Sequence, residues 1–155
     1  MSEKDDLFLI QVRLFRLAQN TWNLDAQKCS ALFNKYDVYD YIKTYYGFFH
    51  IQGDEANLSD IAEYLKNKGV FSYNKAVTNC EYEFGRELLT KMTASVIARK
   101  QKISKVRAFD KFIKSETARM LFDQDSGMWL NGPDYIADEY KREMYFKRTG
   151  KSLKN

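Results

Sequence analysis

The sequence predicts an all-α protein, and three observations support this prediction. The 155 residues include only one proline and seven glycines, so few positions interrupt a regular backbone. Apolar side chains recur at helical spacing in most segments, which is typical of amphipathic helices. The long stretches between turn signals also favour helices over a β architecture, which needs many turns. A chain of this length can bury roughly 70% of its unfolded surface, so we expect it to fold without a disulfide or a metal.

Residues 6–20 predict the first helix, with an apolar face and a polar face. The apolar face is Leu7, Ile10, Leu14 and Leu17, and the side chains left for solvent are Arg13, Arg16 and Gln19. The cap Asn23-Leu24-Asp25 precedes a second helix, which carries Cys29 and Phe33 and ends near Tyr36.

A third helix is predicted over residues 38–50, with Asp37 as its N-cap. This run is apolar nearly all round, so we expect it at the centre of a core or under a partner. A short helix with Ile61, Tyr64 and Leu65 follows, and Gly69 ends it. Residues 70–77 have no helical pattern and are predicted to be a linker.

Three further helices are predicted in the second half of the chain. The first begins near Thr78 or Asn79, ends in the turn 99–102 and has a predicted apolar stripe of Leu88, Leu89, Met92 and Val96. The second, over residues 104–122, buries Val106, Phe109, Ile113, Met120 and Leu121. A polar turn at 123–127 and an apolar plug, Met128-Trp129-Leu130, lead to the last helix, which runs from Pro133 to Gly150 and buries Ile136, Tyr140 and Met144.

We therefore predict about seven helices in two tandem units packed as one compact body, with domains at 1–72 and 73–150 and a tail at 151–155. An offset of 79 residues pairs Gly53 with Gly132 and also pairs apolar positions, which suggests an internal repeat. The apolar pairs are Leu9 with Leu88, Ile10 with Leu89, Leu17 with Val96, Leu24 with Ile103, Phe33 with Phe112 and Ile42 with Leu121. With a loop shortened by four residues, the segment that begins at Ile61 aligns with the segment that begins at Ile136.

Charge is distributed unevenly along the chain. Residues 1–74 carry 8 basic and 10 acidic side chains, whereas residues 75–155 carry 17 basic and 11 acidic ones. The densest basic patch lies within 99–114 and consists of Arg99, Lys100, Lys102, Lys105, Arg107, Lys111 and Lys114. This patch is a solvated face at a helix turn, a nucleic-acid contact, or a contact for an acidic protein partner.

Aromatic and apolar side chains supply a second set of candidate binding residues. Trp129, with Met128 and Tyr135, is either a plug over the core or an anchor for a partner, because tryptophan is a frequent interface hot spot. Tyr46 and Phe48, in the aromatic run, are candidates for the same role.

The sequence shows no pattern of residues that predicts catalysis. His50 is the only histidine, so neither a catalytic triad nor a multi-histidine metal site can form within one chain. No glycine-rich phosphate loop is present, and Cys29 and Cys80 lack metal-binding spacing. We therefore expect a protein that is not an enzyme and has neither a metal nor another cofactor. We also expect it to be cytoplasmic, because the N-terminus is charged and no apolar run is long enough for a membrane span.

Residues 7–69 resemble a small bacterial family of unknown function that is catalogued under the number thirty-seven ninety-one. The resemblance rests on residues 31–38, Asp40-Tyr41-Ile42, Tyr45-Tyr46, His50, Gly53 and residues 60–65. Ile51 replaces the small polar residue that usually follows the histidine in this family, which argues against a shared polar role for His50. Patterns at 112–136 are similar to small proteins of comparable bacterial loci.

The resemblance implies a function that composition and spacing do not give. Members of the family have no established enzymatic activity, and they look like partners of toxins with ADP-ribosyltransferase character encoded beside them. By this resemblance, we expect an antitoxin-like or accessory component of a toxin–antitoxin-like locus, which binds a toxin and occludes its active cleft or holds it inactive. The alternative is a nucleic-acid-binding regulator that uses residues 99–114, and a weaker one is an effector with an unrecognised enzymatic site.

Overall fold

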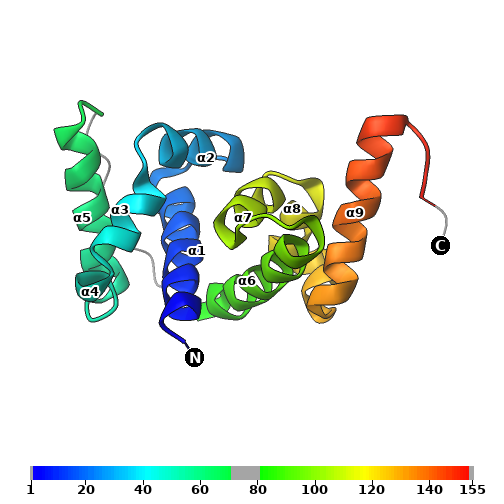
Figure 1. The fold of residues 1–155 in the computed structure, drawn as a ribbon, viewed down its shortest axis with the longest axis horizontal. Helices are drawn as coiled ribbons and strands as arrows, with labels where there is room; N and C mark the ends of the chain where they lie inside the picture. The colour runs from blue at the N-terminus through cyan, green and yellow to red at the C-terminus, as the bar shows by residue number, and fades with distance from the viewer. Residues whose placement is uncertain (1, 71–80, 154–155) are drawn as a thin grey trace. The chain divides into compact units, whose positions relative to one another are not determined.

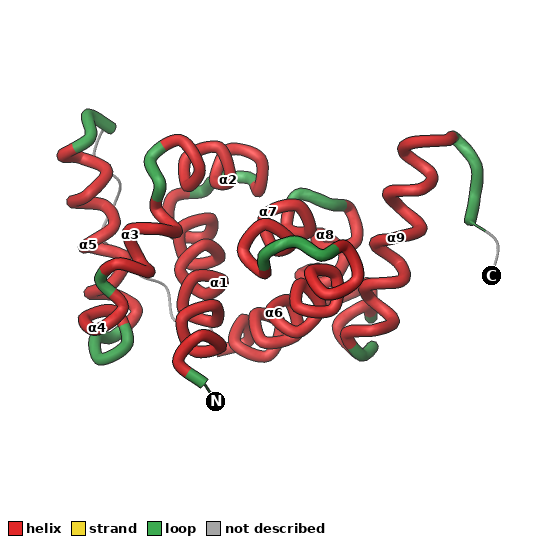
Figure 2. The backbone as a smooth tube through the Cα atoms, viewed as in Figure 1, coloured by secondary structure: helices red, strands yellow, loops and turns green. Residues whose placement is uncertain are grey.

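The computed structural model describes residues 2–70 and 81–153, apart from the side chains of 81–84. Within these residues every regular element is a helix, which confirms the all-α prediction (Figure 1, Figure 2). The chain divides into two compact units, Met1–Glu81 and Tyr82–Asn155, which are described separately here as unit 1 and unit 2. The predicted linker and Cys80 fall largely or wholly outside the described residues.

Unit 1 is built around its first helix, α1, which packs against α2, α3 and α5. Its elements are α1 (Glu3–Trp22), α2 (Ala26–Lys35), α3 (Val38–Thr44), α4 (Tyr46–Phe49) and α5 (Asp54–Asn67). Phe15 of α1 contacts the rings of Phe33 and Tyr39, with centroids 5.1 and 6.4 Å away. Gln11 is also buried, and its Nε2 donates to the Tyr39 carbonyl at 3.0 Å, so this polar group is satisfied inside the core.

Unit 2 places α8 against α7, α9 and two short 3₁₀ turns. Its elements are α6 (Glu81–Gln101), α7 (Lys105–Ile113), α8 (Glu116–Phe122), η1 (Gln124–Ser126), η2 (Met128–Leu130) and α9 (Pro133–Thr149). Phe112 of α7 meets Tyr140 of α9 edge to face, with centroids 5.6 Å apart. None of the described helices combines the length and apolar character that crossing a bilayer requires.

The structure corrects four details of the predicted elements. The run 38–50 breaks at Tyr45 into α3 and α4, and α1 is the helix that packs against most of unit 1. The helix predicted over 104–122 breaks at Ser115, whose Oγ accepts from the Ala118 N–H and so caps α8. Gln19 is buried rather than solvated. In α6, Val96 is buried as predicted and Leu88 and Leu89 are half-buried, but Met92 is exposed; the buried positions also include Thr90, Thr93, Ala94, Ile97 and Ala98.

The two units repeat one order of elements at a constant offset of 79 residues. The N-caps Asp25 and Ser104 are one such pair. The side chain of each accepts a hydrogen bond from the backbone N–H three residues later. Gly53 and Gly132 are another pair and directly precede α5 and α9. Because this offset also holds in α5 and α9, Ile61 corresponds to the buried Tyr140, and the predicted four-residue shortening is not required.

Candidate interaction surface

Three large apolar side chains, each three residues after the one before, are exposed at the connection from α3 to α5. The backbone N–H of Phe48 donates to the Tyr45 carbonyl at 2.9 Å, and that of Ile51 donates to the Phe48 carbonyl at 3.2 Å. Side chains three residues apart are neighbours on a helix, so Phe48 lies next to Tyr45 and Ile51 lies next to Phe48. The exposed fractions are 47% for Tyr45, 62% for Phe48 and 72% for Ile51. We call these three residues the apolar ridge.

The core of unit 1 holds the backbone of the apolar ridge in place. Phe49 lies between the ridge residues in sequence but is buried. Its carbonyl accepts a hydrogen bond of 2.8 Å from Nδ2 of the buried Asn57 in α5. The ridge side chains therefore project from a segment that is anchored from below.

Tyr45 connects the ridge to two further tyrosines. Its ring lies 5.1 Å from that of Tyr41, and Tyr41 stacks on Tyr64 of α5 at 4.1 Å. The Tyr64 hydroxyl donates to the Tyr36 carbonyl at 2.6 Å, which ties α5 to the turn between α2 and α3. We call Tyr41, Tyr45 and Tyr64 the tyrosine cluster.

Electrostatics at the cluster favour the neutral phenols. Burial raises the pKa of Tyr41, and the charge of Asp60 adds to this shift. Burial likewise raises the pKa of Tyr64, with further contributions from Asp37 and Asp40. The carboxylates of α5 and of the α3 N-terminus therefore lie close enough to the stacked rings to act on them.

Tyr46, predicted as a partner-binding residue, makes contacts within unit 1. Its hydroxyl donates to Oδ2 of Asp6 at 2.6 Å, and its ring stacks on His50 at 5.1 Å. The hydrogen bond to Asp6 is the main cause that raises the pKa of Tyr46 to about 12. Tyr46 thus ties α4 to the start of α1, whereas Phe48 extends into solvent.

In unit 2 the predicted plug divides into one buried and two exposed side chains. Met128 is buried and belongs to the core, so it is not part of an exposed surface. Trp129 is 38% exposed and Leu130 is 73% exposed. The Trp129 Nε1 donates to the Gln124 carbonyl at 3.0 Å, which fixes the indole. Tyr135, the remaining aromatic candidate, is also exposed.

A shallow cavity of about 340 Å³ lies beside Trp129. It is lined by Gly85, Arg86, Leu89, Gln124 and Trp129. The Arg86 guanidinium lies over the indole, 5.5 Å from the ring centroid. No sequence pattern indicated that Arg86 or Leu89 lies beside Trp129, because this contact depends on how the 3₁₀ turns fold back onto α6.

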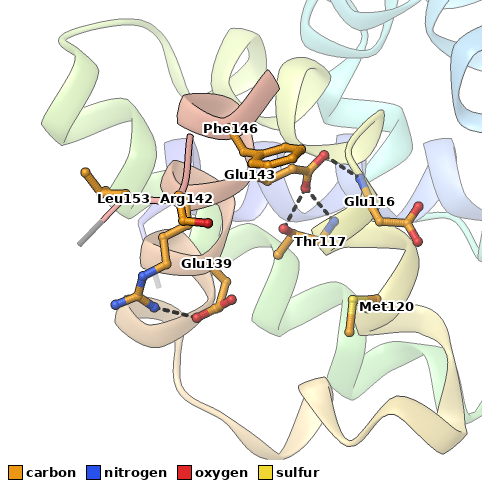
Figure 3. Close-up of a pocket in the computed structure, with 9 residues that line it drawn as sticks. Glu116, Thr117, Met120, Glu139, Arg142, Glu143, Phe146 and Leu153 are labelled. Carbon is orange, nitrogen blue, oxygen red and sulfur yellow. Dashed lines mark hydrogen bonds and ion pairs between the residues drawn. The ribbon is translucent and has the colours of Figure 1, made fainter. Parts of the chain in front are cut away.

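A second cavity of unit 2, of about 360 Å³, lies between α8 and α9 (Figure 3). At its centre, Glu143 of α9 accepts hydrogen bonds from the backbone N–H groups of Glu116 and Thr117 at 2.9 and 2.7 Å. The Thr117 hydroxyl and Lys147 also contact this carboxylate, at 2.7 and 2.8 Å. Burial opposes the charge of Glu143, but these hydrogen bonds together outweigh it and lower the pKa of the carboxyl.

Glu143 therefore completes the N-terminus of α8, where the free N–H groups favour a negative charge. The other described residues that line this cavity are Met120, Glu139, Arg142, Phe146, Ser152 and Leu153. Sequence reasoning did not identify Glu143, because a helix cap contributed from 27 residues away leaves no local pattern.

All seven residues of the predicted basic patch are exposed. They surround the turn from α6 to α7, with Lys102 at a positive φ of 57°. Lys100 reaches Asp138 at 3.7 Å, and Lys114 reaches Asp110 at 3.4 Å. The structure thus places this patch on the surface of unit 2.

The geometry of unit 1 defines a small helical domain with an anchored apolar ridge. Residues 11–68 match the model of the family described as "Protein of unknown function (DUF3791)". This match confirms the predicted resemblance over that segment, which lies within unit 1. The comparisons with curated proteins and with solved structures gave no match.

Proposed function

We propose that this protein is a non-enzymatic protein-binding component of a bacterial toxin–antitoxin-like locus, acting in the cytoplasm. The apolar ridge carries the proposal. Single exposed apolar residues are common on protein surfaces, but several large ones side by side mark interaction sites. Tyr45, Phe48 and Ile51 are three such side chains within seven residues, and Tyr45 extends them into the tyrosine cluster.

The ridge is suited to binding because its backbone is already ordered before a partner docks. Its backbone is already fixed by two turn hydrogen bonds and by Asn57 beneath Phe49. A preorganised surface loses less conformational entropy on association than a flexible loop does. Aromatic side chains add large contact areas with few rotatable bonds.

The resemblance gives the partner class for this proposal. The partner is a toxin with ADP-ribosyltransferase character encoded beside this protein, and the ridge inserts at the entrance of the toxin's active cleft. Binding there blocks substrate access, so inhibition requires no chemistry by the antitoxin-like protein itself.

A growth-rescue assay tests the proposal directly. The neighbouring toxin is expressed with the wild-type protein, which restores growth, or with the double variant Phe48→Asp and Ile51→Asp, which does not. Leu130→Asp is the matched control, since Leu130 is as exposed as Ile51 and follows it by 79 residues. Equal rescue by all three proteins, or a neighbour that is not toxic, contradicts the proposal.

The exposed basic patch favours a second candidate, a nucleic-acid-binding regulator. Lys102, Lys105 and Arg107 are exposed at the turn from α6 to α7 and can neutralise phosphates. Charge reversal of these three residues abolishes salt-dependent binding to DNA or RNA if this candidate is correct. If the toxin partner is correct, the same change leaves the complex intact and alters its association rate.

A further inference from the structure

Four equivalent positions differ in charge between the two units. Unit 2 has Glu116 and Arg119 on α8, and Glu139 and Arg142 on α9. Arg119 pairs with Glu116, and Arg142 pairs with Glu139 at 2.5 Å. These are attractive pairs at i and i+3, which stabilise a helix. This face of unit 2 therefore neutralises its own charge, and Figure 3 shows the pair of Arg142 with Glu139.

The offset of 79 residues places carboxylates at all four of these positions in unit 1. They are Asp37, Asp40, Asp60 and Glu63. All four are exposed, and none forms an ion pair with another residue in the described ranges 2–70 and 81–153. Asp60 and Glu63 stand three residues apart on α5, where like charges cost helix stability, and Asp37 directly precedes α3, three residues before Asp40. Unit 1 thus retains a repulsion that unit 2 removes with two arginines.

Tyrosines lie between the two acid pairs. Tyr41 of α3 and Tyr64 of α5 stack at 4.1 Å, in place of Met120 and Glu143 at the equivalent positions of unit 2. Asp60 acts electrostatically on Tyr41, while Asp37 and Asp40 act on Tyr64. The half-buried rings are therefore flanked by unpaired carboxylates on both sides.

Tyrosine rings in this part of unit 1 already accept cations from the chain itself. Lys68 Nζ lies 5.4 Å from the centroid of Tyr64, and Lys35 Nζ lies 5.4 Å from that of Tyr36. Tyr45, at the edge of the cluster, remains exposed and carries no such cation among the described residues. An incoming cation thus has both an open aromatic ring and nearby carboxylates as partners.

We propose that Asp37, Asp40, Asp60 and Glu63, together with the tyrosine cluster, bind an arginine-rich segment of the protein partner. A guanidinium stacks on an aromatic face and pairs with a carboxylate through two parallel hydrogen bonds, so it satisfies both features at once. This inference rests on the proposed function, since the same partner covers the adjacent ridge. It adds that the bound segment is cationic and takes the place of the two arginines that unit 2 supplies internally.

Exchange of residues between the units tests this inference. The double variant Asp40→Arg and Glu63→Arg gives unit 1 the arginines of unit 2. A fluorescent oligo-arginine peptide binds the wild-type chain. We expect its affinity for the variant to be lower by a factor of roughly ten or more. The thermal midpoint of the variant stays equal or rises, because the new arginines pair with Asp37 and Asp60. Weaker binding with retained stability separates this result from misfolding.

Two controls define the outcomes that overturn the inference. The double variant Glu3→Arg and Glu55→Arg makes the same change in net charge at other exposed positions of unit 1. Equal loss of peptide binding in this control shows general attraction and refutes the site. Displacement of the peptide by millimolar Ca²⁺ or Mg²⁺ refutes it as well, because the carboxylates then form a cation site.

Different experiments show whether this inference fails or the proposed function fails. Phe48→Asp with Ile51→Asp tests the ridge through toxin rescue, whereas the arginine variant is scored by peptide affinity. If peptide binding requires Asp40 and Glu63 but the protein does not rescue growth, the site for a cationic segment is supported and the toxin partner is refuted. If the arginine variant rescues growth at the wild-type level and its peptide affinity is unchanged, the toxin partner is supported and the site for a cationic segment is refuted.

Discussion

Tyr64 in unit 1 and Glu143 in unit 2 occupy equivalent positions, 79 residues apart. Each connects the last helix of its unit to the backbone near the start of the third helix, but Tyr64 donates a hydrogen bond and Glu143 accepts hydrogen bonds. The Tyr64 hydroxyl donates to the carbonyl of Tyr36, just before α3. The Glu143 carboxylate instead accepts from the N–H groups of Glu116 and Thr117, at the start of α8. One helical arrangement thus tolerates either a donor or an acceptor at this join, provided that a backbone partner of the opposite kind lies within reach.

This difference also changes the surface around the join. In unit 2 the ionised carboxylate of Glu143 pairs with Lys147 and is accompanied by two further ion pairs, one on α8 and one on α9. In unit 1 a neutral phenol at the join is accompanied by stacked tyrosines and unpaired acids. The comparison teaches that two units with the same order of helices can carry different side-chain chemistry on their outer faces.

The equivalent core residues Phe33 and Phe112 provide the strongest test of the two-unit comparison. Both are fully buried, so Phe33→Ala and Phe112→Ala each lower the unfolding free energy by about 3–5 kcal/mol. If the units are independently stable, each variant shifts one of two transitions in chemical denaturation monitored by circular dichroism. A single shared transition, shifted equally by both variants, contradicts independent units.

Replacement of the two join residues is expected to have a smaller effect. Glu143→Gln loses the charge at the α8 N-terminus and lowers the unfolding free energy by about 1–3 kcal/mol at neutral pH. Tyr64→Phe removes one neutral hydrogen bond and costs about 1 kcal/mol. Urea denaturation measures both, and a greater loss from Tyr64→Phe contradicts the assigned roles.

The pH dependence of the same variants sharpens this test. The pKa of Glu143 is lowered in the folded state, so its contribution is complete above the unfolded-state pKa of about 4.3 and is lost as pH falls through the folded value. The wild-type unfolding free energy therefore falls more steeply with acid than that of Glu143→Gln. Parallel pH profiles of the two proteins would show that the carboxylate is not responsible.

The smallest effect is expected where the first long helix of each unit ends. Asn23 and Lys102 occupy equivalent positions there, with φ values of 53° and 57°. Asparagine tolerates this left-handed conformation better than lysine does, so Lys102→Gly stabilises the protein by up to about 1 kcal/mol and Asn23→Gly by less. Thermal unfolding measures the difference, and Lys102→Ala serves as a control for loss of the charge.

The order and type of elements could be predicted from the sequence because caps and breaks leave local signals. Asp25, Gly53, Gly132 and Pro133 each stand at a predicted boundary. The predicted buried face of α6 was correct at Val96 but wrong at Met92, because hydropathy favours methionine over threonine as a buried residue. In the structure Thr90 is buried, with its hydroxyl donating to the Arg86 carbonyl at 2.7 Å, so its polarity is satisfied locally.

The candidate site was predictable only in part. Aromatic density identified Phe48 and Trp129, but which side chains stay exposed depends on the short turns. In η2 the turn directs Met128 into the core and leaves Trp129 and Leu130 outside. The unpaired acids of unit 1 could not be recognised from their own sequence, because their meaning comes from arginines at equivalent positions of unit 2.

Each unit contains one of the two tryptophans, in contrasting surroundings. Trp22 of α1 is 8% exposed, whereas Trp129 is 38% exposed and lies beneath a guanidinium. Indole emission shifts to longer wavelength when water reaches the ring, so melting of unit 1 gives a large red shift from Trp22. Quenching by iodide acts first on Trp129. The chain therefore carries an intrinsic optical reporter for each unit, and its fluorescence distinguishes opening of unit 1 from events at the surface of unit 2.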